Sequence, residues 1–172
     1  MLAFLSHLYL VADPRGRVNR KGLLGVAIAL LSVQALAILG HWLETSQILH
    51  FVIAVFEVGS LWIATSAAIK RLHDLGYSGW WVPGSILALF VWTLVACFAT
   101  LLTFGEAVAN VGSPGFMVYA AAVMFWPLAA TFWLHFAPGE NGANRYGPEP
   151  DETGISMPST YAAAPLVSAQ VA

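Results

Sequence analysis

The 172-residue chain is far more apolar than a soluble domain: 59% of its residues are hydrophobic, only 9% are charged, and its mean hydropathy is +0.74. Soluble domains contain about 45–50% apolar and about 25% charged residues. The composition therefore excludes a soluble globular protein and predicts an integral membrane protein. A single cysteine excludes an internal disulfide framework and a multi-cysteine metal site.

Four apolar runs are long enough to cross a bilayer, which takes about 20 helical residues. They cover about residues 22–40, 48–69, 81–104 and 116–136. Runs of this length, rich in Leu, Ala and Val, favour helices over the short alternating strands of a membrane barrel. The predicted fold class is an all-α integral membrane protein, with four transmembrane helices in a bundle, short loops and a disordered C-terminal tail.

The segments outside the membrane domain, residues 22–136, have distinct compositions. Residues 1–21 are predicted to form a cytoplasmic or interfacial segment that starts with a short apolar stretch. Residues 137–150 contain a series of Pro-Gly and Asn-Gly signals, which predict a turn motif. Residues 151–172 carry no charge after Glu152 and no sustained periodicity, which predicts a disordered tail in which substitutions beyond Glu152 have no measurable effect.

The basic residues predict the orientation, because all seven lie on one side of the predicted bundle. The two connections on the other side carry only Glu44 and Glu106 as charges. The positive-inside rule therefore places the N and C termini and the connection between the second and third runs in the cytoplasm. The seven are Arg15, Arg17, Arg20, Lys21, Lys70, Arg71 and Arg145.

Two polar residues stand inside the second run. Glu57 is near its centre, and His50 precedes it by seven residues on the same helical face. A carboxylate in hydrocarbon costs at least a few kcal/mol, so Glu57 should face the bundle interior and be protonated or partnered. It is either a structural residue, hydrogen-bonded to a neighbour such as Gln34 or Thr93, or a relay group for protons.

Smaller signals concern the other helices. Gly25 and Ala29 have the small-xxx-small spacing of close helix packing. Ser78 is a candidate N-cap for the third helix, and Pro127 is predicted to kink the fourth.

The densest polar stretch, KRLHDLGYSGWW at residues 70–81, joins the second and third runs. It is interpreted either as a loop at the membrane surface or as a binding site. Arg71 and Asp74 stand at i, i+3 and can pair; alternatively Asp74 binds Arg145 or the basic cluster at residues 15–20. Either pairing would lock helix ends together.

With GRVNRKG at residues 16–22 and PGENGANRYGPEP at residues 138–150, this stretch resembles a bacterial inner-membrane family known as domain of unknown function 805. The resemblance covers about residues 13–150. It implies a small multi-pass protein of the bacterial inner (plasma) membrane, with no established activity and no catalytic residues. The chain departs from the family pattern where Lys21 and Gly22 replace the usual aromatic residue after the basic cluster, and in its Ala/Ser/Pro-rich tail.

The three motifs all fall on the predicted cytoplasmic side, where they can converge on one surface. We expect this surface to engage anionic lipid headgroups or a membrane-protein partner, a second copy of the chain included, because each Lys or Arg near an anionic membrane contributes about 1 kcal/mol. The candidate binding residues are Arg17, Arg20, Arg71, His73, Asp74, Ser78, Trp80, Asn144 and Arg145.

The alternative function is that of a small transporter or proton-linked protein, with Glu57 and His50 as relay groups and His73 and Asp74 at the cytoplasmic mouth. An enzyme is not expected: a helix would point the adjacent His73 and Asp74 in different directions, and Ser78 lacks a nucleophile-elbow context. No metal site, cofactor or nucleic-acid partner is predicted, since no diagnostic ligand spacing or phosphate-binding glycine loop occurs.

Overall fold

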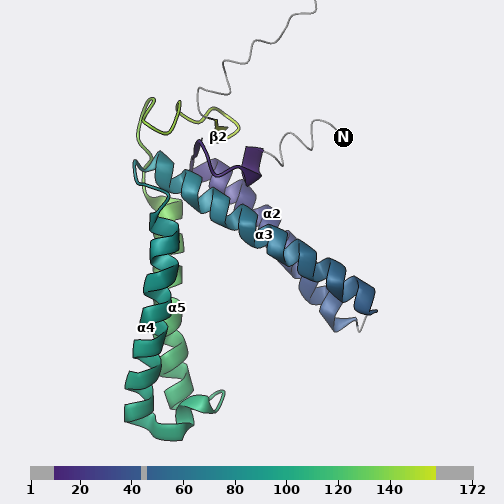
Figure 1. Ribbon diagram of the computed structural model, residues 1–172, viewed down its shortest axis with the longest axis vertical. Coiled ribbons are helices and arrows are strands. Elements are labelled where there is room, and N and C mark those ends of the chain that lie inside the picture. The colour runs from purple at the N-terminus through teal and green to yellow at the C-terminus, as the bar shows by residue number, and fades with distance from the viewer. Residues whose placement is uncertain (1–9, 44–45, 158–172) are drawn as a thin grey trace, which may run out of the picture. The chain divides into compact units, whose positions relative to one another are not determined.

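The computed structural model describes residues 10–43 and 46–157 (Figure 1). The chain divides into two compact units, unit 1 formed by Met1–Gly79 with Ala137–Ala172 and unit 2 by Trp80–Phe136. Within the described residues, four helices are long and apolar enough to span a membrane, which confirms the all-α membrane fold. Most of the interfacial stretch predicted at residues 1–11, and the predicted tail from residue 158 onward, lie outside the described residues.

Unit 1 is built on a hairpin of two helices, α2 (Arg20–Trp42) and α3 (Gln47–Asp74). Helix α2 begins two residues before the predicted run because the Asn19 side chain caps it, accepting a hydrogen bond from the Gly22 N–H at 3.0 Å. The helices approach closely at Gly40, where a Cβ atom would lie 2.6 Å from Ile53 Cδ1. Farther along, Gln34 Nε2 donates to Ser60 Oγ at 3.1 Å.

Helix α3 continues past residue 69, where the apolar run ends, through Lys70–Asp74. The first half of the polar stretch is therefore the last turn of a helix rather than a loop. The helix stops at Gly76, whose φ of 78° suits glycine. Two backbone hydrogen bonds satisfy its final carbonyls: Tyr77 N–H donates to Leu72 O at 2.8 Å, and Gly76 N–H donates to His73 O at 3.1 Å.

Unit 2 contains α4 (Trp81–Phe104), the 3₁₀ helix η1 (Gly105–Ala109) and α5 (Pro114–Phe136). The N-cap residue of α4 is Trp80, so the prediction that Ser78 caps this helix is wrong. Helix α5 runs through Pro127 without ending. One turn away, the Trp92 indole N–H donates to Ala122 O at 3.0 Å and ties α4 to α5.

A two-stranded antiparallel ladder joins the ends of unit 1. Strand β1 (Arg17–Val18) pairs with β2 (Ile155–Ser156), with Arg17 opposite Ser156, and Asn19 N–H donates to Gly154 O at 2.9 Å. The predicted disordered tail therefore starts too early, because residues 151–157 fold back onto β1. Gly154 and Ser156 are buried, so substitutions at these two positions are now expected to have a measurable effect.

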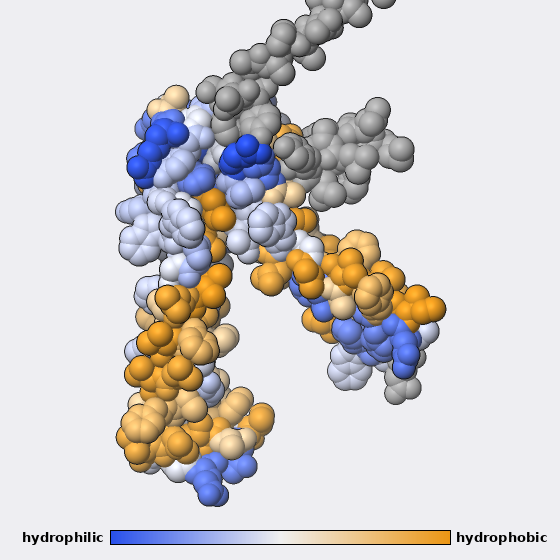
Figure 2. Space-filling view, in the orientation of Figure 1, coloured by the Kyte–Doolittle hydropathy of each residue, from blue (hydrophilic) through white to orange (hydrophobic). Residues whose placement is uncertain are grey.

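Large apolar side chains point outward along all four long helices, as the orange surfaces of Figure 2 show. Leu31, Phe56, Phe90 and Phe125 are each more than 60% exposed. Such faces suit contact with lipid tails, so the fold is that of a membrane protein. The predicted packing of Gly25 is not found within the described chain, since nothing lies within 4 Å of a Cβ atom placed there.

Candidate functional site

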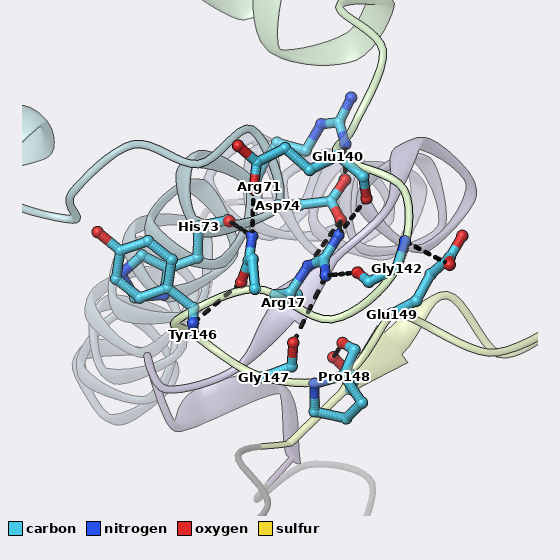
Figure 3. Close-up of polar contacts among 12 residues, drawn as sticks. Arg17, Arg71, His73, Asp74, Glu140, Gly142, Tyr146, Gly147, Pro148 and Glu149 are labelled. Atoms are coloured by element: carbon cyan, nitrogen blue, oxygen red, sulfur yellow. Dashed lines mark hydrogen bonds and ion pairs between the residues drawn. The ribbon is translucent and has the colours of Figure 1, made fainter.

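The three sequence motifs meet where α2 begins and α3 ends. We name this region of unit 1 the cap; it consists of residues 13–22, 70–79 and 137–157. Polar contacts gather in it around two arginines and one aspartate (Figure 3). The convergence follows from the hairpin, which places the first turn of α2 beside the last turn of α3, and from the chain's return to unit 1 at Ala137.

Asp74 is the centre of the cap. It is 2% exposed, and its two carboxylate oxygens are divided between two guanidinium groups. Arg17 donates to Oδ1 from Nε at 3.1 Å and from Nη2 at 2.9 Å, while Arg71 Nη1 donates to Oδ2. Both arginines are 0% exposed. The predicted Arg71–Asp74 pairing at i, i+3 is confirmed, and so is the pairing of Asp74 with the 15–20 cluster; Arg145 takes no part in these ion pairs.

Arg17 also holds the turn motif. Its Nη2 donates to the Glu140 carbonyl and its Nη1 to the carbonyls of Gly142 and Gly147 (Figure 3). The other arginine, Arg71, donates from Nη2 to the Ala137 carbonyl. Buried charges need both counterions and hydrogen-bond partners, and the two arginines have both in the Asp74 carboxylate and the backbone carbonyls.

Gly139 lets the turn motif approach the Asp74 carboxylate closely. A Cβ atom on Gly139 would lie 2.2 Å from Asp74 Oδ2, closer than any side chain tolerates. One residue later, Glu140 N–H donates to the Asp74 carbonyl at 2.8 Å. The Pro-Gly turn at residues 138–139 is thus placed directly over the Asp74 carboxylate.

A second group of contacts surrounds His73. Its Nδ1 donates to Gly16 O at 3.0 Å, and its ring stacks on Tyr146 at 3.9 Å between centroids. Asn144 Nδ2 donates to His73 O at 2.9 Å, and Arg145 lies over the Tyr146 ring while Nη2 donates to Gly76 O at 3.2 Å. These contacts fix the NRY sequence of the third motif to the end of α3.

The predicted binding residues thus separate into buried and exposed groups. Arg17, Arg71 and Asp74 are buried in the cap rather than exposed on it, and their role in binding stays a prediction. Arg20 and Arg145 are exposed, whereas His73, Ser78 and Asn144 are half-buried. Trp80 is 81% exposed and belongs to unit 2.

Sequence reasoning missed a row of three donors on α3. Trp62 Nε1 donates to Ala12 O at 3.0 Å, Ser66 Oγ donates to Val11 O at 2.8 Å, and Lys70 Nζ donates to Leu10 O. Residues 10–12 are helical, and their carbonyls are the ones that a helix end leaves without intrahelical partners. The sequence signal for this row is the spacing of four residues between the three donors, which places them on one face of the helix.

The chain between this row and the cap is held by an ion pair. Arg15 donates from Nε to Asp13 Oδ1 at 3.0 Å and from Nη2 to Oδ2 at 2.8 Å. These side-chain hydrogen bonds, opposed by burial, lower the pKa of Asp13 below its ordinary value of 3.8.

The polar residues inside the hairpin form a looser group. Glu57 Oε1 lies 3.7 Å from His41 Nε2, and the His41 ring stacks on His50 at 5.3 Å between centroids. Of the two partners suggested for Glu57, Gln34 bonds to Ser60 instead. The Glu57 side chain is 41% exposed, and its predicted place inside a four-helix bundle stays a prediction.

The cap contains a cleft of about 190 Å³. Arg20 lines it together with the buried pair Arg71 and Asp74, the turn at residues 138–141, Glu149 and Pro150. Within residues 10–43 and 46–157 no group of three His, Cys, Asp or Glu side chains is arranged to hold a metal ion.

Four apolar helices and a polar cap define a multi-pass membrane protein. The chain belongs to the family described as "Protein of unknown function (DUF805)", whose profile matches residues 11–148. That match covers the first two motifs and nearly all of the third. No curated protein and no solved structure matches the chain significantly.

Proposed function

We propose that the protein is a non-enzymatic membrane scaffold of the bacterial inner membrane, with both termini in the cytoplasm, whose cap engages membrane lipids or a membrane-protein partner. The observation that carries this proposal is the closed cap. The buried charges of Arg17, Arg71 and Asp74 are consumed by ion pairs within the cap, which makes it a rigid platform rather than a reactive centre. A rigid polar platform at the ends of membrane helices suits docking at the membrane surface.

The charge distribution supports the orientation. Every Lys and Arg lies in or beside the cap, while the far ends of the two helix hairpins carry only acidic charges in Glu44 and Glu106. Both connections at the far ends are short, which is the condition under which the positive-inside rule applies best.

The burial of Arg17 and Arg71 changes which residues should contact a ligand. Among the described residues, Arg20, Lys21 and Arg145 are the exposed cations that are not held in an ion pair. Each contributes about 1 kcal/mol against an anionic membrane surface, so together they supply a preference of a few kcal/mol. Glu140 and Glu149 of the cap are also exposed and reduce this attraction.

The test is native mass spectrometry of the protein released from its own membrane. Wild type should carry a defined lipid or protein that the variant Arg20→Ala with Arg145→Ala loses. Arg20→Lys with Arg145→Lys is the matched control, which keeps the charge and should keep most of the ligand. The proposal would be contradicted if wild type and the alanine variant were both folded and neither carried a bound lipid or protein.

The group His41, His50 and Glu57 favours a second candidate, a proton-linked transport step. Three titratable side chains in contact within a membrane hairpin are the kind of arrangement from which proton relays are built. The hairpin alone offers little room for a substrate path, so this candidate requires an assembly of several copies.

Proteoliposomes that contain a pH-sensitive dye separate the two candidates. The transport candidate predicts a proton flux in wild type that Glu57→Gln removes while lipid retention by the cap stays unchanged. Flux that is equal in wild type, Glu57→Gln and empty liposomes would eliminate it.

A further inference from the structure

The cleft in the cap has room for a small polar group. Its volume of about 190 Å³ corresponds to about six water molecules, since each water occupies about 30 Å³. It is lined at its base by Arg71 and Asp74, both more than nine-tenths buried, and elsewhere by Arg20, Glu140 and Glu149. A lipid headgroup fits such a volume, whereas an acyl chain does not.

The lining charges are of both signs. Arg71 and Asp74 neutralise one another, together with Arg17, as ion pairs. Arg20 makes no hydrogen bond or ion pair within the part of the chain that the structure describes, and its charge acts unfavourably on that of Arg71. The cleft therefore presents one cation that lacks a counterion and that a bound anion would satisfy.

The two glutamates of the cleft can accept hydrogen bonds from a positively charged group of a ligand. Glu149 Oε2 accepts a hydrogen bond from Gly142 N–H at 2.8 Å, and Glu140 Oε2 accepts one from Asn144 Nδ2 at 2.8 Å. Because a carboxylate has about four acceptor positions, both retain capacity for further donors. A simple anion at Arg20 would meet these two negative charges, so the best ligand carries a positive group as well.

The level of the cleft in the membrane follows from α2. Arg20 is its first residue, and the apolar run begins two residues later at Gly22. The cleft thus lies where the hydrocarbon ends and phospholipid headgroups begin. Asn19 already caps one N–H of this helix end, that of Gly22.

We infer that the cleft binds a zwitterionic phospholipid headgroup with a phosphodiester and a primary ammonium, as in an ethanolamine phospholipid. Arg20 receives the phosphate, and Glu140 and Glu149 accept hydrogen bonds from the ammonium. A trimethylammonium headgroup has the same charges but no N–H donors, and a glycerol headgroup has no cation. This inference rests on the proposed function and names the ligand of the cap.

The experiment is native mass spectrometry of the full-length protein in detergent, with an equimolar mixture of ethanolamine, choline and glycerol phospholipids of identical acyl chains. Wild type should retain the ethanolamine lipid roughly tenfold over either competitor, as expected for charge-assisted hydrogen bonds. Arg20→Ala should lower its retention by a similar factor, and Arg20→Lys by less. Glu152→Gln removes an exposed charge of the cap that does not line the cleft, and should change nothing.

The glutamates provide the decisive readout. Glu140→Gln with Glu149→Gln preserves an acceptor oxygen on each side chain and should abolish the preference for ethanolamine over glycerol headgroups. An unchanged thermal midpoint identifies variants that remain folded.

Three outcomes would overturn the inference. Wild type that holds the glycerol lipid as well as the ethanolamine lipid would leave the proposed function standing but with an anionic ligand. Displacement of the lipid by micromolar free glycerophosphoethanolamine would identify a soluble ligand instead. Retention of no lipid by wild type would remove the inference, and the proposed function would then depend on a protein partner alone.

Discussion

Two charged clusters in unit 1, one in the cap and one inside the hairpin, show opposite uses of charge in one membrane protein. In the cap, Arg17, Arg71 and Asp74 are almost wholly buried, and their donors also bind backbone carbonyls. Inside the hairpin, His41 and Glu57 lie 3.7 Å apart with side chains 46% and 41% exposed. The cap cluster is part of the architecture, because removing Asp74 would leave both arginines buried without a counterion. The second holds little of the fold together and is the one available for a functional role.

The comparison predicts its largest effect at Asp74. Asp74→Asn leaves two guanidinium groups buried without an anion, and breaking a buried pair in this way costs about 3–5 kcal/mol. The midpoint of denaturant-induced unfolding in detergent should fall accordingly, with loss of folded protein in the membrane.

Glu57→Gln is the matched control, because it also removes one carboxylate from an ion pair. Its cost should be smaller than that of Asp74→Asn, because the amide removes a charge that hydrocarbon disfavours. Equal losses in the two variants would contradict the distinction between a structural pair and a loose one.

The next largest effect is expected at Gly139. In Gly139→Ala the new methyl group would lie 2.2 Å from Asp74 Oδ2, so the turn must move off the carboxylate. We expect a loss of about 1–3 kcal/mol in the free energy of unfolding, the usual cost of overpacking.

Gly59→Ala serves as the comparison for Gly139→Ala, since nothing lies within 4 Å of a Cβ atom on Gly59. That variant should be neutral or slightly stabilising, because alanine favours the helix. A Gly139→Ala variant as stable as Gly59→Ala would show that the turn does not press on Asp74.

An intermediate, local effect is expected at Lys70. Lys70→Met keeps the length of the side chain but removes the donor to the Leu10 carbonyl, one of three on this face of α3. Amide hydrogen exchange of residues 10–13 should accelerate by roughly tenfold, as the loss of one charged hydrogen bond implies. Exchange in the cap at Asn144 should stay unchanged; acceleration at both places would mean that Lys70 supports the whole unit.

The smallest effect is expected at Asp13. Its pKa is lowered in the folded protein, so the stability it contributes is present above the ordinary value of 3.8 and is lost as pH falls through the lowered value. Asp13→Asn should cost up to about 1 kcal/mol at pH 7, because the partner Arg15 is 59% exposed. The difference from wild type should vanish in acid; a difference that persists there would assign the effect to something other than the carboxylate charge.

Much of the fold was predictable, and for a simple reason. The apolar runs and the short connections determine the four helices, because in hydrocarbon each backbone must satisfy its own hydrogen bonds. The i, i+3 spacing was sufficient to predict the Arg71–Asp74 pair. The contacts of the cap were harder to predict from the sequence, since Arg17 binds the carbonyls of Gly142 and Gly147, which lie more than one hundred positions away.

The errors have physical causes too. Composition assigned residues 151–157 to a disordered tail, yet two backbone pairs with β1 and the small residue Gly154 are enough to hold them. Gln34 was suggested as a partner of Glu57, but it bonds to Ser60. Position in a run does not say which way a side chain faces.

By itself, the sequence determined that this is a four-helix membrane protein of the DUF805 family, where its helices run, and which three motifs carry its charge. Hydrophobicity and length suffice for that, because they act through solvent rather than through particular neighbours. Only the tertiary structure decided that Arg17 and Arg71 are buried around Asp74 while Arg20 lines an open cleft. Whether a cation faces protein or water depends on which distant carbonyls and carboxylates reach it, and that is decided only when the segments around residues 17 and 140 pack together.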